Sequence, residues 1–181
     1  NVHDYPLLEI NQTPGSLKSV KYPMAGQNSE YGKVGVYNTK RKTLIYLQPV
    51  HEKDDYVTNL TWSPNDEFIY IAELNRDQNH MKWAQYDVNT GKRIKTIFEE
   101  KNNKWVEPEY PLYFIPEKND EFITLSERDG FMNLYHYNTN GKLLNQITKN
   151  KWVTTALLAV KENTIYFQGT GEDPRELHTY S

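Results

Sequence analysis

Residues 68–98 read FIYIAELNRDQNHMKWAQYDVNTGKRIKTIF, and this stretch decides the fold class. Residues 68–74 are rich in aromatic and β-branched side chains, as buried strands are. Residues 83–88 have the same character, and the Asn-Thr-Gly-Lys that follows predicts a hairpin turn, because Asn and Gly tolerate positive φ. Residues 93–98 alternate polar and apolar side chains, which is typical of a half-buried or edge strand. The stretch therefore predicts consecutive antiparallel strands, and we expect little helix anywhere in the chain.

The same succession of segments returns further along the chain. Residues 122–125 repeat the pattern of 68–71, and residues 134–137 repeat that of 83–86. The turn sequence also returns, as Asn-Thr-Asn-Gly-Lys at 138–142. Further strand-like segments lie at 34–39, 43–47, 143–147, 164–167 and 177–180. The chain is therefore built from repeated units of strands.

The length of the repeat predicts the architecture. Tyr37, Tyr86 and Tyr137 end equivalent strands and lie 49 and 51 residues apart. Four strands every ~40–50 residues are the signature of a β-propeller blade. We therefore predict an all-β fold, a partial β-propeller of about three to four four-stranded antiparallel blades. The single segment 1–181 divides into an entry hairpin or arm at 1–26 and blade-like units at 27–50, 56–100, 111–149 and 152–181.

The last unit has no fourth strand before Ser181, so we expect an open part of a larger propeller rather than a small four-bladed ring. Exposed strand edges and apolar blade faces act as templates for pairing, which predicts self-association. Because the chain starts at Asn1 rather than Met, we expect an excised segment or a mature fragment.

Composition excludes several classes of protein. The 181 residues carry 21 Lys and Arg against 24 Asp and Glu, and this balance argues against nucleic-acid binding, which needs a basic face. The absence of cysteine excludes disulfides, thiolate metal sites and a Cys nucleophile. The 13% of aromatic residues argue against disorder. No apolar run approaches the ~20 residues that span a bilayer.

The residues offer no catalytic machinery of their own. None of the serines lies in a Gly-x-Ser-x-Gly elbow, and Ser63 is expected to cap a turn. The five histidines lack metal-ligand spacing, so we predict no metal site and no cofactor. The Glu99-Glu100 pair is interpreted as a solvated strand end rather than a catalytic pair.

Two segments differ from ordinary strands and turns. The first, KWVEPEYP at 104–111, is aromatic, acidic and proline-rich, and it precedes the first strand of a blade. Loops between blades face one end of a propeller, where ligands bind. Its candidate substrate-binding residues are Trp105, Glu107, Glu109 and Tyr110, although packing is an alternative role for Trp105. The second segment, residues 5–26, contains turn residues that predict a projecting hairpin suited to interaction.

Four motifs, in the right order, resemble those of the dipeptidyl peptidase IV family. They are KYPMAGQNS at 21–29, TWSP at 61–64 with NRDQN at 75–79, SERDGF at 126–131, and YFQGTGEDP at 166–174. The resemblance covers about residues 5–181. Phe131 departs from the pattern, since bacterial members commonly have Trp there.

The resemblance implies a two-domain serine exopeptidase that releases N-terminal dipeptides, often after proline. In that family an eight-bladed propeller caps an α/β-hydrolase domain, whose Ser-Asp-His triad would follow this segment in the parent chain. A glutamate pair that anchors the substrate's amino terminus would precede the segment. The resemblance also implies that residues 105–110 reach the extended substrate region and that an arm at 6–26 helps form a homodimer. Residues 107–110 contain no arginine, so the contact chemistry differs from the family's.

We therefore expect a non-catalytic propeller segment of a bacterial dipeptidyl peptidase, periplasmic or extracellular by resemblance. It would gate and help bind peptide substrates, with the hydrolase domain as its partner in the parent chain and with no nucleic acid and no membrane span. A propeller-type scaffold that binds proteins or glycans, without an enzymatic parent, is the alternative.

Overall fold

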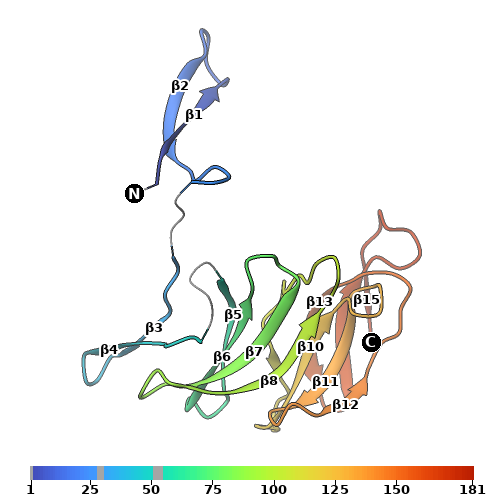
Figure 1. Cartoon of the computed structure of the whole chain (residues 1–181). Helices are drawn as coiled ribbons and strands as arrows, with labels where there is room; N and C mark the ends of the chain where they lie inside the picture. The colour runs from blue at the N-terminus through green and yellow to red at the C-terminus, as the bar shows by residue number, and fades with distance from the viewer. Residues whose placement is uncertain (1, 28–30, 51–54) are drawn as a thin grey trace. The chain divides into compact units, whose positions relative to one another are not determined.

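The computed structural model describes residues 2–27, 31–50 and 55–181, and these residues form strands, turns and loops without any helix. The chain divides into two compact units, residues 1–32 and residues 33–181 (Figure 1). The predicted all-β class is therefore confirmed, and each unit is described below by itself.

The first unit is a two-stranded antiparallel hairpin. Strand β1 (Asp4–Glu9) pairs with β2 (Ser16–Lys21), and Leu8 faces Leu17 in the register. The Lys21 ammonium lies 3.0 Å from an Asp4 carboxylate oxygen at the open end of the hairpin. A two-stranded ribbon cannot bury a face of its own, so its aliphatic side chains stay exposed.

The second unit contains four antiparallel sheets. Their strands are β3 (Gly35–Asn38) and β4 (Thr43–Tyr46); β5 (Tyr56–Trp62), β6 (Phe68–Leu74), β7 (His80–Asp87) and β8 (Arg93–Lys101); β9 (Tyr113–Phe114), β10 (Glu121–Ser126), β11 (Asn133–Asn138) and β12 (Leu143–Gln146); β13 (Thr154–Lys161), β14 (Thr164–Gly169) and β15 (His178–Tyr180). Within each sheet the strands pair in chain order. Two sheets have the four strands of a propeller blade, whereas the described residues give two strands to the first sheet and three to the last.

The alternation along β6 explains how the sheets stack. Ile69 and Ile71 belong to a core cluster with Leu47 on one side of the sheet. Tyr70 and Ala72 belong to a cluster on the other side, which includes residues of the β9–β12 sheet. A central blade strand is buried on both faces, which is why 68–74 reads as an almost continuous apolar run. Figure 1 shows the sheets arranged as successive layers.

Aromatic rings fill the space between the two four-stranded sheets. Phe98 of β8 stacks on Tyr137 of β11 with ring centroids 4.5 Å apart, and Phe122 stacks on Tyr137 at 5.9 Å. A third cluster, with Ile123, Leu134 and Phe167 as its buried members, joins the β9–β12 sheet to the β13–β15 sheet. Large rings thus supply a core to a chain with only 37% hydrophobic residues.

The predicted hairpin turns also hold neighbouring sheets together. Gly91 and Gly141 have φ angles of +70° and +85°, as the sequence predicted. A β-carbon on Gly91 would lie 2.3 Å from the Tyr46 carbonyl oxygen, and one on Gly141 would lie 1.9 Å from that of Ile97. Each turn therefore fits tightly against the outer strand of the preceding sheet, and only glycine leaves room for it.

Candidate functional site

The loop that joins β8 to β9, residues 102–112, contains all four predicted substrate-binding residues. The strand pairings put Tyr56 opposite Leu74 and Met81 opposite Glu100, so this loop lies at the same end of its sheet as the β6–β7 turn. In the next sheet, the β10–β11 turn at 127–132 occupies the corresponding end. This end of the unit is called the loop end below.

Hydrogen bonds from two sheets, β5–β8 and β13–β15, hold the loop in place. The Val106 amide donates to the Gln78 carbonyl oxygen at 2.7 Å, and the Leu112 amide donates to Thr61 Oγ1 at 3.0 Å. The Asn59 side-chain amide donates to the Pro108 carbonyl oxygen. The Tyr110 hydroxyl donates to the Thr155 carbonyl oxygen on β13. Val106 and Leu112 are also buried in the core cluster. The loop is therefore held near both ends by these two residues and in between by the bonds to Pro108 and Tyr110.

A groove of about 390 Å³ lies beside this loop. Its lining combines apolar, aromatic, polar and acidic side chains: Tyr56, Thr58, Leu74, Gln78, Val106, Glu107, Pro108 and Glu109. The volume lies within the range of sites that hold small ligands or single side chains. We refer to it as the loop groove.

The structure brings together only two of the four predicted residues. Glu107 and Glu109 are exposed and both line the loop groove. Trp105 is not among the residues that line it, and this residue is 49% exposed rather than packed in the core. Tyr110 is half-buried, and its hydroxyl is committed to Thr155. Tyr110 therefore anchors the loop, whereas the two glutamates are exposed at the groove.

Several carboxylates lie close to one another at the loop end. The pKa of Glu127, in the β10–β11 turn, is raised first by burial and next by the nearby Glu107 carboxylate, with smaller contributions from Glu109 and Glu100. A side-chain hydrogen bond with Trp105 opposes the rise. Burial, and then Glu109, also raises the pKa of Tyr110. The carboxylates of the loop groove therefore act on Tyr110 in their own loop and on Glu127 in the β10–β11 turn.

Sequence reasoning missed one group, the cluster around Arg128. Ser126 Oγ donates to Glu100 Oε2 at 2.8 Å, the Arg128 guanidinium pairs with Glu100, and Arg128 Nε donates to Ser126 Oγ at 2.9 Å. The guanidinium carbon lies 4.3 Å from the centre of the Tyr135 ring. Arg128 thus links β8 of one sheet to β10 and β11 of the next.

The interpretation of Glu99-Glu100 as a solvated strand end is therefore wrong for one of the two residues. The Glu100 side chain is only 11% exposed and is paired with Arg128, whereas that of Glu99 is 49% exposed. The pattern of the sequence contained no signal for this pairing, because Arg128 lies in a segment that reads as an ordinary turn.

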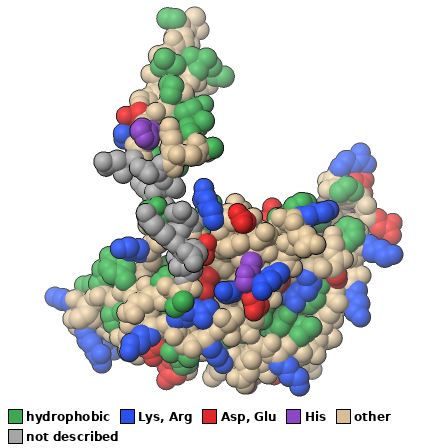
Figure 2. Space-filling view, in the orientation of Figure 1, with side chains coloured by type: hydrophobic (Ala, Val, Ile, Leu, Met, Phe, Trp, Pro, Cys, Tyr) green, Lys and Arg blue, Asp and Glu red, His purple; other side chains and the backbone are tan. Residues whose placement is uncertain are grey.

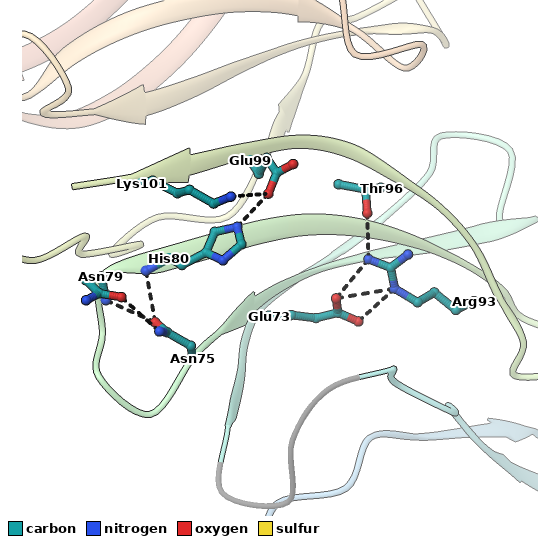
Figure 3. Close-up of polar contacts among 8 residues, drawn as sticks. All are labelled: Glu73, Asn75, Asn79, His80, Arg93, Thr96, Glu99 and Lys101. Carbon is teal, nitrogen blue, oxygen red and sulfur yellow. Dashed lines mark hydrogen bonds and ion pairs between the residues drawn. The ribbon is translucent and has the colours of Figure 1, made fainter. Parts of the chain in front are cut away.

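Figure 3 shows how the β6–β7 turn at the loop groove is fixed. Asn75 Oδ1 accepts hydrogen bonds from the backbone amides of Asn79 at 3.0 Å and His80 at 2.9 Å. His80 Nε2 lies 2.5 Å from Glu99 Oε2, which Lys101 also approaches at 3.7 Å. These contacts hold the turn that presents the Gln78 carbonyl to the β8–β9 loop.

The serine and histidine residues that the sequence analysis considered make contacts that stabilise turns and strands. The Ser63 hydroxyl accepts from the Phe68 amide at 2.9 Å, so Ser63 caps its turn as predicted. His136 and His178 each lie 2.8 Å from a glutamate oxygen, of Glu121 and Glu176 respectively. Within the described ranges, no group of three or more His, Asp or Glu side chains is arranged to hold a metal ion. A helix able to cross a membrane is likewise absent from the part of the chain that the structure describes.

Comparison with known proteins relates this chain to a protein family. The family model described as "Dipeptidyl peptidase IV (DPP IV) N-terminal region" matches residues 1–181. Dipeptidyl aminopeptidase B of Saccharomyces cerevisiae is 24% identical over 177 residues, which cover 91% of this chain and 22% of the yeast protein.

Two solved structures are similar to this chain. A Bacteroides ovatus protein, provisionally described as dipeptidyl aminopeptidase IV, superimposes with a TM-score of 0.83 and 36% identity over 93% of this chain and 27% of its own. Porphyromonas gingivalis dipeptidyl peptidase 4 superimposes with a TM-score of 0.82 and 24% identity over 99% of this chain and 26% of its own, a likeness that shows the fold.

The chain thus spans about a quarter of the length of these solved relatives and about a fifth of the yeast protein. The family model, in contrast, matches every residue of the chain. The chain belongs to the dipeptidyl peptidase IV N-terminal region family.

Proposed function

We propose that this chain forms part of a propeller wall over the active site of a bacterial dipeptidyl peptidase IV-like serine exopeptidase. In this role it gates the entry of peptides and helps bind them for release of N-terminal dipeptides. Family membership supports an enzymatic parent and argues against an unrelated scaffold. The alternative of a self-contained glycan-binding propeller has no support in a chain that spans about a quarter of its solved relatives.

The β8–β9 loop is the observation that carries the proposal. It is hydrogen-bonded to two sheets, yet two of its carboxylates remain exposed beside a groove of about 390 Å³. A loop that is fixed in this way loses little conformational entropy when a peptide binds. We infer that Glu107 and Glu109 contact the peptide, with Trp105 as an exposed neighbour and Tyr110 as the anchor.

The chemistry must come from another part of the parent protein. The described residues hold no serine paired with a histidine and a carboxylate, and the buried Ser63 hydroxyl is bonded to its own turn. A nucleophile, a base and an oxyanion hole are all needed for acyl transfer. We infer that a C-terminal α/β-hydrolase domain supplies them and is the main partner of this segment.

We also propose that the arm at 6–26 helps form a homodimer. Its strands expose aliphatic side chains, with Leu8 64% and Leu17 74% exposed, and Figure 2 shows hydrophobic side chains along the hairpin. A second copy would cover these side chains. Sedimentation of the wild type and of a Leu8→Ser, Leu17→Ser variant tests this. The proposal predicts a dimer that the double variant dissociates, and a wild type that stays monomeric at high concentration would contradict it.

The proposed location is periplasmic or extracellular, in line with the resemblance to exported bacterial peptidases. Cell fractionation of the producing organism tests it, and recovery of the protein only with cytosolic markers would contradict it.

The direct test of function compares the complete reading frame with the 181-residue chain on a glycyl-prolyl chromogenic amide. Cleavage by the complete protein and none by the chain alone is the expected result. An inactive complete protein whose sequence encodes no Gly-x-Ser-x-Gly segment would overturn the proposal.

A further inference from the structure

We propose that the loop groove binds a lysine or arginine side chain of the bound peptide, which makes the parent enzyme selective for basic peptides. This inference rests on the proposed function and specifies its substrate class.

The floor of the loop groove suits the aliphatic part of such a side chain. Leu74 and Val106 are 7% and 6% exposed, and together with Pro108 they form the apolar part of the lining. Lysine and arginine bury their methylene groups along apolar surface and keep the charged head in a polar setting. A wholly polar or wholly apolar groove would not match both parts.

The rim of the loop groove supplies the charge. Glu107 and Glu109 both line it, and no ion pair among the described residues includes either of them, although Glu109 shares a side-chain hydrogen bond with Tyr110. Three cations of the loop end have other contacts: Lys101 pairs with Glu99, Arg128 pairs with Glu100, and Arg76 lies over the Tyr56 ring. The two rim carboxylates are therefore available to a cationic head group.

Tyr56 cannot serve as the main recognition element for that head group. The Arg76 guanidinium lies 5.2 Å from the centre of the Tyr56 ring and also donates to the Tyr56 hydroxyl. A second cation over the same ring would be repelled by Arg76. Recognition must then come from the two glutamates, on the side of the groove formed by the β8–β9 loop.

The surroundings disfavour an acidic side chain. Glu127 lies close enough to Glu107 and Glu109 for both to raise its pKa. An acidic side chain in the loop groove would add to this repulsion, whereas a basic one would relieve it. Charge complementarity thus selects one class of occupant.

Binding of labelled hexapeptides to the complete protein tests the inference. The peptides are made uncleavable by an N-methylated bond after the second residue, and each of positions three to six carries in turn lysine or its neutral counterpart norleucine. At one of these four positions, the lysine peptide should bind about fivefold to tenfold more tightly than the norleucine peptide. Two partly exposed ion pairs would give a difference of this size. The Glu107→Gln, Glu109→Gln variant should lose this preference and bind norleucine peptides as the wild type does.

The matched control is Glu117→Gln with Glu162→Gln. These two exposed glutamates lie in the β9–β10 and β13–β14 turns, at the end of the sheets opposite the loop end. The control removes the same net charge, so it should keep the preference for lysine. An equal loss of preference in the control would mean that net charge alone is responsible, which overturns the inference.

The remaining outcomes are also decisive. If lysine and norleucine peptides bind the wild type equally, the inference fails while the proposed function stands. If no peptide binds, the proposed function fails as well. If N-acetylation of the peptide, rather than loss of lysine, removes the effect of the glutamate substitutions, the loop groove binds the terminal amine and the inference is wrong. The comparison of peptides on the wild type needs no variant to fold.

Discussion

At the scale of single residues, the turn glycines decide whether neighbouring sheets can approach. Gly141 combines a φ of +85° with a position where an added β-carbon would lie 1.9 Å from the Ile97 carbonyl oxygen. We predict that Gly141→Ala costs roughly 2–5 kcal/mol of unfolding free energy, from the left-handed backbone and from displacement of the β8 backbone. Gly130→Ala is the matched control, because its φ is +101° and nothing lies within 4 Å of the added carbon.

The control should cost only about 1–2 kcal/mol, since only the backbone conformation is unfavourable there. Denaturant unfolding of both variants measures the difference. Equal losses in Gly141→Ala and Gly130→Ala would show that contact between the sheets does not depend on Gly141.

The pair formed by Glu73 and Arg93 is the most deeply buried ion pair among the described residues. The Glu73 side chain is 3% exposed, and its carboxylate accepts from Arg93 Nη2 at 2.9 Å (Figure 3). It also accepts from the Tyr86 hydroxyl. We predict that Arg93→Met costs about 3–5 kcal/mol, because it leaves a buried carboxylate without its cation. The double variant with Glu73→Gln should recover part of that loss. Denaturant unfolding gives both values, and a loss below about 1 kcal/mol in the single variant would contradict the account.

Glu127 makes stability depend on pH in a known direction. Its pKa in the folded protein is raised by burial and by Glu107, so the ionised form is disfavoured in the folded state. The cost of ionisation is therefore absent below the usual glutamate pKa and is fully present above the raised one. Glu127→Gln should raise the thermal midpoint at pH 7 and leave it unchanged near pH 3. A lower midpoint at pH 7 would mean that the carboxylate stabilises the turn.

At the scale of elements, Arg128 connects two sheets at the loop end. It pairs with Glu100 at the end of β8, and its guanidinium lies against the Tyr135 ring of β11. Arg128→Lys keeps the charge but loses the planar, forked donor group, so we expect a loss of about 1–3 kcal/mol. Arg175→Lys is the control, since the Arg175 side chain is 87% exposed and, among the described residues, bonds the nearby Asp173 alone. Thermal unfolding should separate the two variants, and equal midpoints would argue against a link between sheets.

The sequence predicted regular strands well and irregular ones poorly. Strand β6 is buried on both faces, so its apolar run was easy to recognise. Strand β5 was not identified by pattern, because Asn59 has a φ of +54° and the register shifts between Thr58 and Thr61. Strand β13 has two such shifts, which break the alternation in the same way.

The sequence predicted only the part of the candidate site that lies within one continuous segment. The unusual composition of 104–111 predicted Glu107 and Glu109 as binding residues, and both line the loop groove. The pairing of Glu100 with Arg128 joins residues 28 positions apart in different sheets, and the anchoring of Tyr110 by Thr155 spans 45 positions. Contacts of this kind arise from the stacking of blades and leave no periodic signal in one sequence.

At the scale of the whole molecule, the chain is a hairpin unit followed by a series of packed sheets. The β13–β15 sheet exposes large apolar side chains such as Leu158, which is 46% exposed. Apolar surface of this kind favours association with further chain or with another copy. The self-association expected from the sequence therefore remains a prediction for the isolated chain, and sedimentation over a range of concentrations would measure it.

The central claim is that the β8–β9 loop meets peptide substrates of the parent enzyme. Photo-crosslinking tests it most directly, with a photoreactive phenylalanine analogue placed at Glu109 of the complete protein and, as control, at Glu117. The account predicts that a labelled hexapeptide crosslinks at position 109, that unlabelled peptide competes, and that position 117 gives no such product. Equal crosslinking at both positions, or none at 109 while the enzyme cleaves the peptide, would contradict it.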